Sequence, residues 1–276
     1  MIQLENLRYV YPNGVEALRN ISLKIWEGEL IAIMGENGSG KTTLLKHLNG
    51  LLKPTEGRVL VDGQDTRKVS VAELSRKVGI VFQTPDTMFF TESVWSEIYF
   101  SLKVMGYPED EAASRAEYAL KFMDLWNYKD RSPFTLSGGE KKRLSIAIVL
   151  AWQPKYIVID EPTVGQDAPS RRRLEQLIQE LRGEGITIIL SSHDVEFVID
   201  LRPRVILLSK GKLLADGPAE SILTDEDKLE KASLLLPQIP LLMKKLSMIG
   251  VNPGCITVEE ALMEIGTKVK PPKSLG

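Results

Sequence analysis

The chain has 276 residues, and its 35 Lys and Arg against 37 Asp and Glu give a formal net charge of −2. This balance excludes a strongly basic or acidic chain, so we expect no nucleic-acid partner. Hydrophobic residues make up 43% of the sequence but are interrupted by charges everywhere, and no stretch approaches the roughly 18 apolar residues of a membrane-spanning helix.

The cysteine content and the first residues predict a cytosolic chain. The single cysteine, Cys255, cannot form an internal disulfide, and residues 1–5 lack the basic and then apolar layout of a signal peptide. One cysteine and two histidines are also too few for a zinc site. We therefore expect any metal to be a hard cation bound by oxygen atoms.

The first predicted elements are two antiparallel strands, because residues 2–25 alternate apolar and polar side chains around the turn Pro12-Asn13-Gly14. Residues 30–34 form a short, continuous apolar run, which is typical of a strand buried on both faces. Helical patterns separate this run from three similar ones, and such alternation predicts a parallel α/β sheet. The three later runs are residues 78–82, 156–159 and 186–190.

The remaining predicted elements are mostly helical. Apolar residues at helical spacing indicate a helical subdomain over residues 94–125, and a further helix is expected over residues 167–182. Leucine-rich amphipathic stretches follow in residues 234–249, and a last helix begins at Thr257. Residues 268–276 are expected to form a frayed tail.

Residues 35–42, Gly-Glu-Asn-Gly-Ser-Gly-Lys-Thr, match the pattern G-x-x-x-x-G-K-[ST] directly after the strand at residues 30–34. Glycines let backbone N–H groups converge on phosphate oxygens, and the following helix N-terminus adds partial positive charge. We expect Lys41 to reach the β and γ phosphates of a nucleotide and Thr42 to bind Mg²⁺. About one chain of this length in a hundred matches by chance. The residues predicted to bind the nucleotide are Gly35, Asn37, Gly38, Ser39, Gly40, Lys41, Thr42 and Thr43.

Two adjacent carboxylates, Asp160 and Glu161, end the apolar run at residues 156–159. The carboxyl ends of parallel strands form the edge of a sheet where ligands bind. Asp160 is expected to hold Mg²⁺, directly or through water, while Glu161 orients and deprotonates an attacking water. Alone, the pair would more simply be a solvated acidic turn, but the glycine loop favours the catalytic interpretation.

A second candidate anion site is Ser137-Gly138-Gly139-Glu140, which precedes a helical stretch over residues 141–152. Ser137 is expected to cap this helix, and the two glycines leave its first amides free. The glycine loop already holds the phosphates from one side, so this second site either folds over them in the same chain or serves a neighbouring chain. A simple helix cap is the structural alternative.

Together these motifs resemble the ATP-binding cassette (ABC) family, in which a P-loop, an LSGG(Q/E) signature, an acidic strand end and a downstream histidine occur in this order. The resemblance covers about residues 2–223. Gln83, the Thr84-Pro85-Asp86 that follows it, residues 161–167 and the C-terminal extension are similar, more specifically, to the ATPases of energy-coupling-factor importers.

The resemblance implies an α/β fold: a P-loop NTPase core with a mixed or parallel sheet, an N-terminal antiparallel β-subdomain, an inserted helical subdomain and a small C-terminal helical extension. The ATPase cassette is expected over residues 1–223, with the helical subdomain at about residues 93–152. The extension, residues 224–276, is expected to hold two ATPase subunits together even without nucleotide.

The resemblance also implies a head-to-tail dimer that holds two ATP molecules, each between the glycine loop of one chain and Ser137 to Glu140 of the other. The matching positions are Tyr11, which stacks on adenine; Gln83, which senses Mg²⁺ and the transporter; His193, which touches the γ-phosphate; and Asp167, which crosses to the partner. Taken alone, Tyr11 and Gln83 would be ordinary edge-strand and strand-end residues.

The predicted function is ATP hydrolysis by a peripheral subunit on the cytoplasmic face of the cell membrane. Its partners would be a second ATPase subunit, a membrane coupling subunit and a substrate-binding membrane subunit, and the cargo would be a vitamin or transition-metal ion.

A groove for a coupling helix of the membrane subunit is expected between residues 84–90 and the helical subdomain. Phe89, Phe90 and Trp95 are the candidate residues of this groove, although Trp95 equally suits the core. Two other classes stay open: a soluble ABC-type ATPase not linked to transport, and a P-loop small-molecule kinase.

Overall fold

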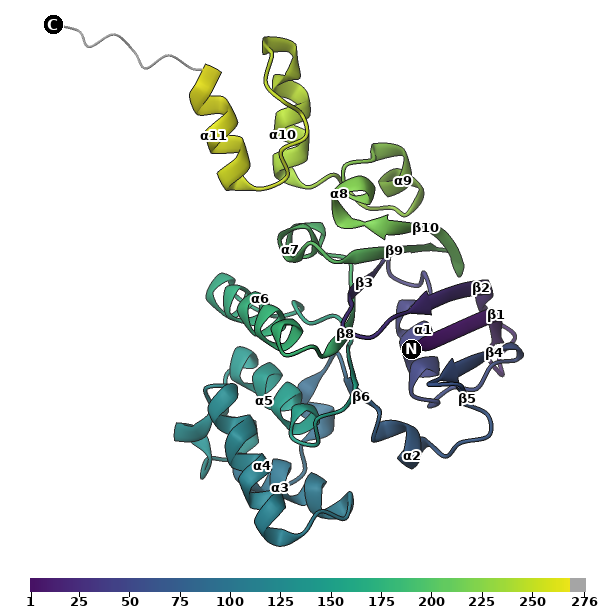
Figure 1. Ribbon diagram of the computed structural model, residues 1–276, viewed down its shortest axis with the longest axis vertical. Helices are drawn as coiled ribbons and strands as arrows, with labels where there is room; N and C mark the ends of the chain where they lie inside the picture. The colour runs from purple at the N-terminus through teal and green to yellow at the C-terminus, as the bar shows by residue number, and fades with distance from the viewer. Residues whose placement is uncertain (269–276) are drawn as a thin grey trace, which may run out of the picture.

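The computed structural model describes residues 1–268 and confirms the α/β class. Two sheets lie side by side, with helices on the far side of the larger one (Figure 1). Apart from Lys268, the predicted frayed tail lies outside the described residues. No helix among residues 1–268 is both long and apolar enough to cross a membrane.

The smaller sheet is antiparallel and has the strand order β2-β1-β4-β5. Its first two strands pair as the alternating pattern predicts, and the turn at Pro12-Asn13-Gly14 is closed by the Tyr11 N–H, which donates to the Val15 carbonyl at 2.9 Å. The four strands are β1 (Ile2–Val10), β2 (Glu16–Ile25), β4 (Glu56–Val61) and β5 (Gln64–Asp65).

The larger sheet has six strands in the order β10-β9-β3-β8-β7-β6. Five of them run parallel, and β10 pairs antiparallel with β9 at one edge, so the sheet is mixed. The strand predicted at residues 186–190 extends two residues further and ends on two buried serines. The six strands are β3 (Leu30–Met34), β6 (Val78–Val81), β7 (Tyr156–Ile159), β8 (Thr187–Ser192), β9 (Arg204–Ser209) and β10 (Lys212–Pro218).

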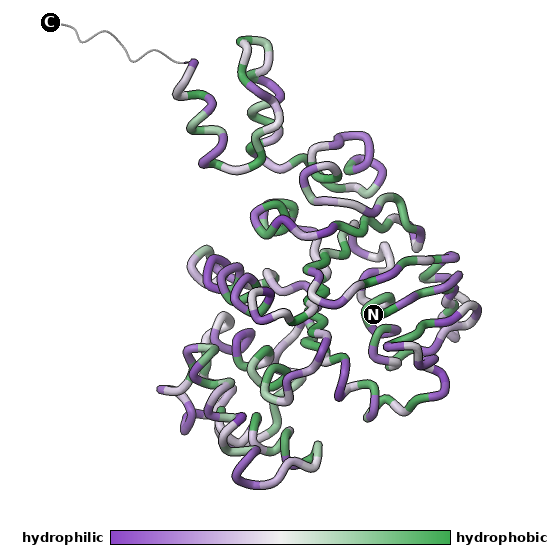
Figure 2. Tube along the Cα trace, viewed as in Figure 1, coloured by the Kyte–Doolittle hydropathy of each residue, from purple (hydrophilic) through white to green (hydrophobic). Residues whose placement is uncertain are grey.

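Two hydrophobic cores lie on opposite faces of the six-stranded sheet, which explains why its strands are apolar throughout. In β3, Ile31 and Ile33 face the core shared with the antiparallel sheet, whereas Leu30, Ala32 and Met34 face the core shared with the helices. Figure 2 shows the hydrophobic colour concentrated along these central strands. Helix α1 (Lys41–Leu48) packs into the first core, between the two sheets.

The helices on the other face include the predicted helical subdomain. Buried alanines at positions 112, 116 and 119 form one stripe of α4, and such small side chains let neighbouring helices approach closely. Gly106-Tyr107-Pro108 interrupts the helical structure between α3 and α4, as the sequence indicates. The helices of this face are α3 (Val94–Val104), α4 (Glu109–Phe122), α5 (Gly138–Leu150), α6 (Ala168–Gly183) and α7 (Val195–Leu201), and the short α2 (Val71–Ser75) precedes β6.

As far as Lys268, the C-terminal part contains four α-helices, of which the last two project from the body of the molecule (Figure 1). Leu229 and Ala232, from α9 and its end, belong to the large core, whereas α10 and α11 share a separate small core around Met243. Thr257 and Glu260 cap α11 reciprocally, as predicted. The four helices are α8 (Ala219–Ile222), α9 (Glu226–Lys231), α10 (Gln238–Leu246) and α11 (Val258–Lys268).

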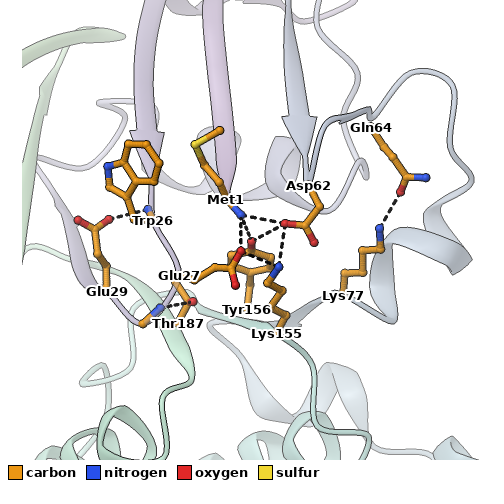
Figure 3. Close-up of polar contacts among 11 residues, drawn as sticks. Met1, Trp26, Glu27, Glu29, Asp62, Gln64, Lys77, Lys155, Tyr156 and Thr187 are labelled. Atoms are coloured by element: carbon orange, nitrogen blue, oxygen red, sulfur yellow. Dashed lines mark hydrogen bonds and ion pairs between the residues drawn. The ribbon is translucent and has the colours of Figure 1, made fainter.

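A polar cluster joins the two sheets at the start of β1 (Figure 3). The Asp62 carboxylate accepts hydrogen bonds from the Met1 amino group at 2.8 Å, the Tyr156 hydroxyl at 2.8 Å and the Lys155 ammonium at 3.1 Å. Burial alone would raise the pKa of Asp62, but these three donors outweigh it and lower the pKa to about 2. Asp62 therefore stays ionised and ties the turn after β4 to the start of β7.

Candidate nucleotide-binding and catalytic site

The candidate site lies at the carboxyl ends of four neighbouring parallel strands. The order β3-β8-β7-β6 places the glycine loop, His193, the pair Asp160–Glu161 and Gln83 next to one another, because each follows one of these strands. Ligands of parallel sheets bind at this edge. Residues separated by up to 158 positions thus meet in one place.

The glycine loop wraps around the side chain of Lys41. The Lys41 ammonium donates to the carbonyls of Gly35 at 2.8 Å and Glu36 at 3.1 Å. Gly35 has a φ of 148°, and a Cβ there would lie 2.2 Å from the Leu208 carbonyl oxygen, so only glycine fits. Helix α1 begins at Lys41, and no described side chain caps it, which leaves its first amides available to an anion.

A cavity of about 560 Å³ opens beside this loop. Gly35 and Ser39 of the predicted glycine-loop residues do not line it, and Ser39 is almost fully buried. The walls also include Val15, Glu16, Ala17 and Val164, which the sequence did not single out. The predicted residues that line the cavity are Tyr11, Asn37, Gly38, Gly40, Lys41, Thr42, Thr43, Gln83, Glu161 and His193.

Tyr11, which directly follows β1, forms part of the cavity wall. Its hydroxyl lies 2.9 Å from the Thr43 hydroxyl, and its ring packs edge-on against Tyr9 at 4.9 Å between centroids. Tyr9 in turn contacts His47, which is fully buried, and burial lowers the pKa of His47 to about 4. His47 is therefore a neutral packing residue that supports the aromatic wall.

The oxygen atoms expected to bind Mg²⁺ lie together. The Thr42 hydroxyl donates to Asp160 Oδ2 at 2.8 Å, and Gln83 lines the same cavity. Among residues 1–268, no group of three or more Asp, Glu, His or Cys side chains could hold a metal by itself. One carboxylate, a hydroxyl and an amide suit Mg²⁺, which is usually bound through one or two carboxylates together with substrate phosphates.

Glu161 is held from two sides at the cavity. Its Oε1 lies 3.2 Å from the Lys41 ammonium, and its Oε2 lies 2.9 Å from His193 Nδ1. The Glu161 backbone has a φ of 44°, a left-handed conformation that costs free energy in a non-glycine residue and is typical of functional sites. The carboxylate is almost fully buried, and a partly desolvated carboxylate beside a phosphate cradle can act as a general base.

The segment Ser137 to Glu140 lies outside this cavity, as does Asp167. The Ser137 hydroxyl accepts from the Glu140 N–H at 3.3 Å, and the Glu140 carboxylate accepts from the Ser137 N–H at 2.7 Å, so the two residues cap α5 reciprocally. Asp167 caps α6, accepting from the Ser170 N–H at 2.9 Å. The sequence left open whether residues 137–140 fold over the phosphates bound by their own chain or serve a neighbouring chain. In this structure they do not fold over the cavity of their own chain.

Ser191 is a site residue that the sequence analysis missed. Its hydroxyl donates to Asp160 Oδ1 and accepts from the Glu161 N–H at 2.9 Å, and the side chain is fully buried. It follows Leu190, which pairs with Ile159 of β7, so it lies directly beside Asp160. The sequence signal that could have revealed this residue is a serine at the end of the strand that lies next to the acidic pair.

Replacing Ser191 with Ala is expected to lower kcat for ATP hydrolysis about tenfold, since the Asp160 carboxylate and the Glu161 backbone both lose their anchor. It should also lower the free energy of unfolding by about 1–3 kcal/mol, because buried polar groups lose their partner. Steady-state ATPase assays and thermal unfolding measure the two effects. Ser192→Ala is the matched control, since this buried serine bonds the Asp194 N–H instead; equal kcat in the two variants would contradict the anchoring role.

Comparison with known proteins identifies the class of this site. The model of the ABC transporter family matches residues 18–164, which include the glycine loop, the signature segment and the acidic pair. The chain therefore belongs to the ABC transporter family, and it is an ATP-hydrolysing cassette of that family. The P-loop small-molecule kinase considered from the sequence is excluded by this membership.

Curated relatives cover nearly the whole chain. The energy-coupling factor transporter ATP-binding protein EcfA of Methanothermobacter thermautotrophicus is 42% identical over 96% of this chain and 86% of its own length. A putative ABC transporter ATP-binding protein of Pyrococcus horikoshii is 46% identical over 96% of this chain and all of its own length.

Solved structures agree with this assignment. CbiO1 of Clostridium perfringens, described as part of the ABC transporter complex CbiONQ, has a TM-score of 0.77 and 37% identity, covering 88% of this chain and 98% of its own. The ATP-binding cassette MJ0796, solved as a dimer bound to ADP and phosphate, has a TM-score of 0.72 and 31% identity, covering 79% of this chain and 99% of its own.

Proposed function

We propose that this ATPase is the peripheral subunit of a membrane importer, attached to the cytoplasmic face of the cell membrane. In this proposal, ATP hydrolysis drives a separate membrane coupling subunit and a substrate-binding membrane subunit that take up a vitamin or a transition-metal ion. The similarity to EcfA and to CbiO1, whose names place them in transporters, supports this assignment.

The observation that carries the proposal is an apolar groove of about 440 Å³ between the helical subdomain and the sheet. Phe90 is 63% exposed, Phe100 46% and Val104 69%, which is far more than packed side chains of this size normally show. Such a groove suits the apolar face of an amphipathic helix from a membrane subunit. The groove is lined by Asn49, Leu51, Ser75, Gly79, Ile80, Phe82, Phe90, Phe100, Ser101, Val104, Met105, Ile148 and Trp152.

The structure corrects part of the sequence prediction for this groove. Phe89 is only 6% exposed and lies in the large core, so it is not a groove residue. Trp95 packs against Tyr99 and Trp126 at the edge of the same core. Of the three predicted aromatics only Phe90 lines the groove, because successive side chains of an extended segment point to opposite sides.

The groove also lies close to the nucleotide site in the chain. Phe82, which lines the groove, directly precedes Gln83, which lines the nucleotide cavity. A helix that moves in the groove would therefore displace the backbone next to the nucleotide. This adjacency provides a direct mechanical route between hydrolysis and a membrane partner.

Dimerisation around ATP is the second part of the proposal. Ser137 to Gly139 lie outside the cavity of their own chain, so in a head-to-tail dimer they would bind the γ-phosphate held by the partner's glycine loop. The free amides at the start of α5 would gain an anion only in this closed state, which gives ATP a higher affinity for the dimer than for the separate chains. Phosphate loss would remove that preference and reopen the dimer.

The chemistry assigned to the chain is mostly positioning and charge stabilisation. Lys41 would leave Glu161 and turn to the β and γ phosphates, since a polyphosphate attracts it more strongly than one carboxylate. Glu161, now released on one side and still held by His193, would accept a proton from the attacking water. Mg²⁺, held by Thr42, Asp160 and Gln83, would neutralise phosphate charge when bound.

Helices α10 and α11 are the proposed nucleotide-independent dimer contact. They share their own small core, and several of their apolar side chains face outwards, which is typical of an interface. Residues 225–237 are better grouped with the cassette, because Leu229 and Ala232 lie in the large core and the Glu36 N–H of the glycine loop donates to the Ala232 carbonyl at 3.2 Å. The outward-facing apolar residues of α10, α11 and the turn after α10 are Leu241, Leu242, Met248, Ile249, Val258, Leu262 and Met263.

Truncation after Pro237 is therefore expected to leave a folded cassette that has lost its dimer in the absence of ATP. Thermal unfolding should show a cooperative transition, and light scattering should report a monomer without nucleotide where the full chain gives a dimer. A truncated chain that stays dimeric without ATP would contradict the role of α10 and α11.

The importer proposal is tested with the tagged chain purified from its native membranes in mild detergent. Recovery of integral membrane proteins that lack a cassette supports it, whereas recovery of soluble partners alone supports the soluble ABC-type ATPase. Phe90→Asp is expected to abolish recovery of the membrane partners while leaving the ATPase activity of the isolated chain within about twofold of wild type. Trp26→Asp is the matched control, since Trp26 is 53% exposed but does not line the groove.

A further inference from the structure

Lys142 is a buried lysine that takes no part in the proposed mechanism of ATP hydrolysis. It lies in α5, and only 2% of its surface is exposed. Its ammonium donates to the backbone carbonyl of Phe82 at 3.2 Å and to that of Gln83 at 3.0 Å. Lys142 thus connects the middle of α5 to the backbone between the nucleotide cavity and the apolar groove.

A buried ammonium is costly, and a well-packed apolar side chain would usually be at least as favourable for stability. Burial lowers the pKa of Lys142 to about 8, and the negative charges of Asp160 and Glu161 oppose this effect. Two backbone carbonyls and two nearby carboxylates together keep the ammonium in place. The group is therefore held where the catalytic carboxylates and the Gln83 backbone can both act on it.

The position of Lys142 along α5 gives the contact its significance. The helix begins directly after Ser137, and Lys142 is about 7.5 Å further along the axis at the ordinary rise of an α-helix. The backbone hydrogen bonds of an α-helix make so short a segment stiff. A displacement of the first amides of α5 would therefore shift Lys142 and, through its two hydrogen bonds, the Phe82 and Gln83 carbonyls.

We infer that Lys142 is a positioning residue that links the signature end of α5 to Gln83 and thereby couples the two nucleotide sites of the dimer. This inference rests on the proposed head-to-tail dimer. In that dimer, Ser137 contacts the nucleotide bound by the partner, whereas Gln83 faces the nucleotide bound by its own chain. A phosphate that draws in the start of α5 at one site would set the position of Gln83 at the other.

A second contact also joins α5 to the segment that follows Gln83, but this contact is much weaker. Lys141 forms an ion pair with Asp86 at 2.7 Å, but the Asp86 side chain is 49% exposed. Exposed ion pairs contribute little because water screens them. Lys141→Met is therefore a suitable control. It removes one positive charge from α5 and the ion pair with Asp86, but it leaves the hydrogen bond of Lys142 to the Gln83 backbone in place.

The test compares the ATP dependence of hydrolysis in wild type, Lys142→Met, Lys142→Arg and Lys141→Met. Lys142→Met is expected to lower kcat about tenfold, to leave the KM for ATP within about threefold, and to abolish the cooperativity between the two sites. Lys142→Arg keeps the charge and the donors and should retain most of the cooperativity. Lys141→Met should behave like wild type.

A merely structural role would predict a different pattern, in which Lys142→Met loses thermal stability but the folded fraction keeps wild-type cooperativity and kcat. That result would overturn the inference. If the Met variant does not fold, Lys142→Gln carries the same comparison, because its amide keeps a polar group in the buried space but is too short to replace both hydrogen bonds. A wild-type chain that shows no ATP-dependent dimer would contradict the proposed function itself, which separates the two failures.

Discussion

Replacing Glu161 with Gln is expected to lower kcat for ATP hydrolysis by about 100- to 10,000-fold while ATP still binds. The amide fills the same space but cannot accept a proton from water. It also removes the negative charge that lies 3.2 Å from the Lys41 ammonium. Lys41 then turns to the phosphates without leaving a carboxylate partner, so ATP should bind more tightly to the variant than to wild type.

The measurement combines single-turnover hydrolysis with the size of the protein in the presence of ATP. We expect the Glu161→Gln chain to accumulate as a closed dimer that holds uncleaved ATP. Glu180→Gln on the exposed side of α6 is the control for the loss of one carboxylate, and its kinetics should match wild type. Wild-type turnover by Glu161→Gln would show that another group is the base.

Replacing Lys41 with Met should weaken ATP binding about 10- to 100-fold, because hydrogen bonds to a charged group are worth about 1.5–3 kcal/mol. The same change leaves Glu161 as a buried carboxylate without its lysine. We therefore expect the nucleotide-free variant to lose about 3 kcal/mol of unfolding free energy, as buried ion pairs do when one partner is removed.

Isothermal titration with a non-hydrolysable ATP analogue and thermal unfolding measure the two effects. Lys46→Met is the matched control, since Lys46 lies on the same helix α1 but does not line the cavity. The double variant with Glu161→Gln offers a stricter comparison. It should recover much of the stability lost in Lys41→Met but none of the affinity, because the unpaired charge is gone while the phosphates still lack their cation.

Much of the fold and of the candidate site could be read from the sequence, because the responsible signals are local. The continuous apolar runs of β3, β6 and β7 are short, which is typical of strands buried on both faces. The glycine loop needs several residues of one short segment to bind phosphate. Such requirements appear in consecutive residues and are visible without tertiary information.

Other features depended on contacts between distant segments and were not foreseen. Ser191 reaches Asp160 because β8 lies beside β7 in register, and Lys142 reaches the Gln83 backbone because α5 packs next to the end of β6. The contact of α9 with the body of the molecule has the same origin, since Leu229 and Ala232 lie in a core built from residues far away in the chain.

By itself, the sequence determined the phosphate loop, the acidic pair and the alternation of strands and helices, since backbone conformation and hydrophobic periodicity are encoded residue by residue. Only the tertiary structure decided that Phe90 faces the groove while Phe89 is buried, and that the signature segment lies away from its own cavity. Those outcomes follow from how helices and sheets pack, and packing is a property of surfaces built from residues far apart in the chain.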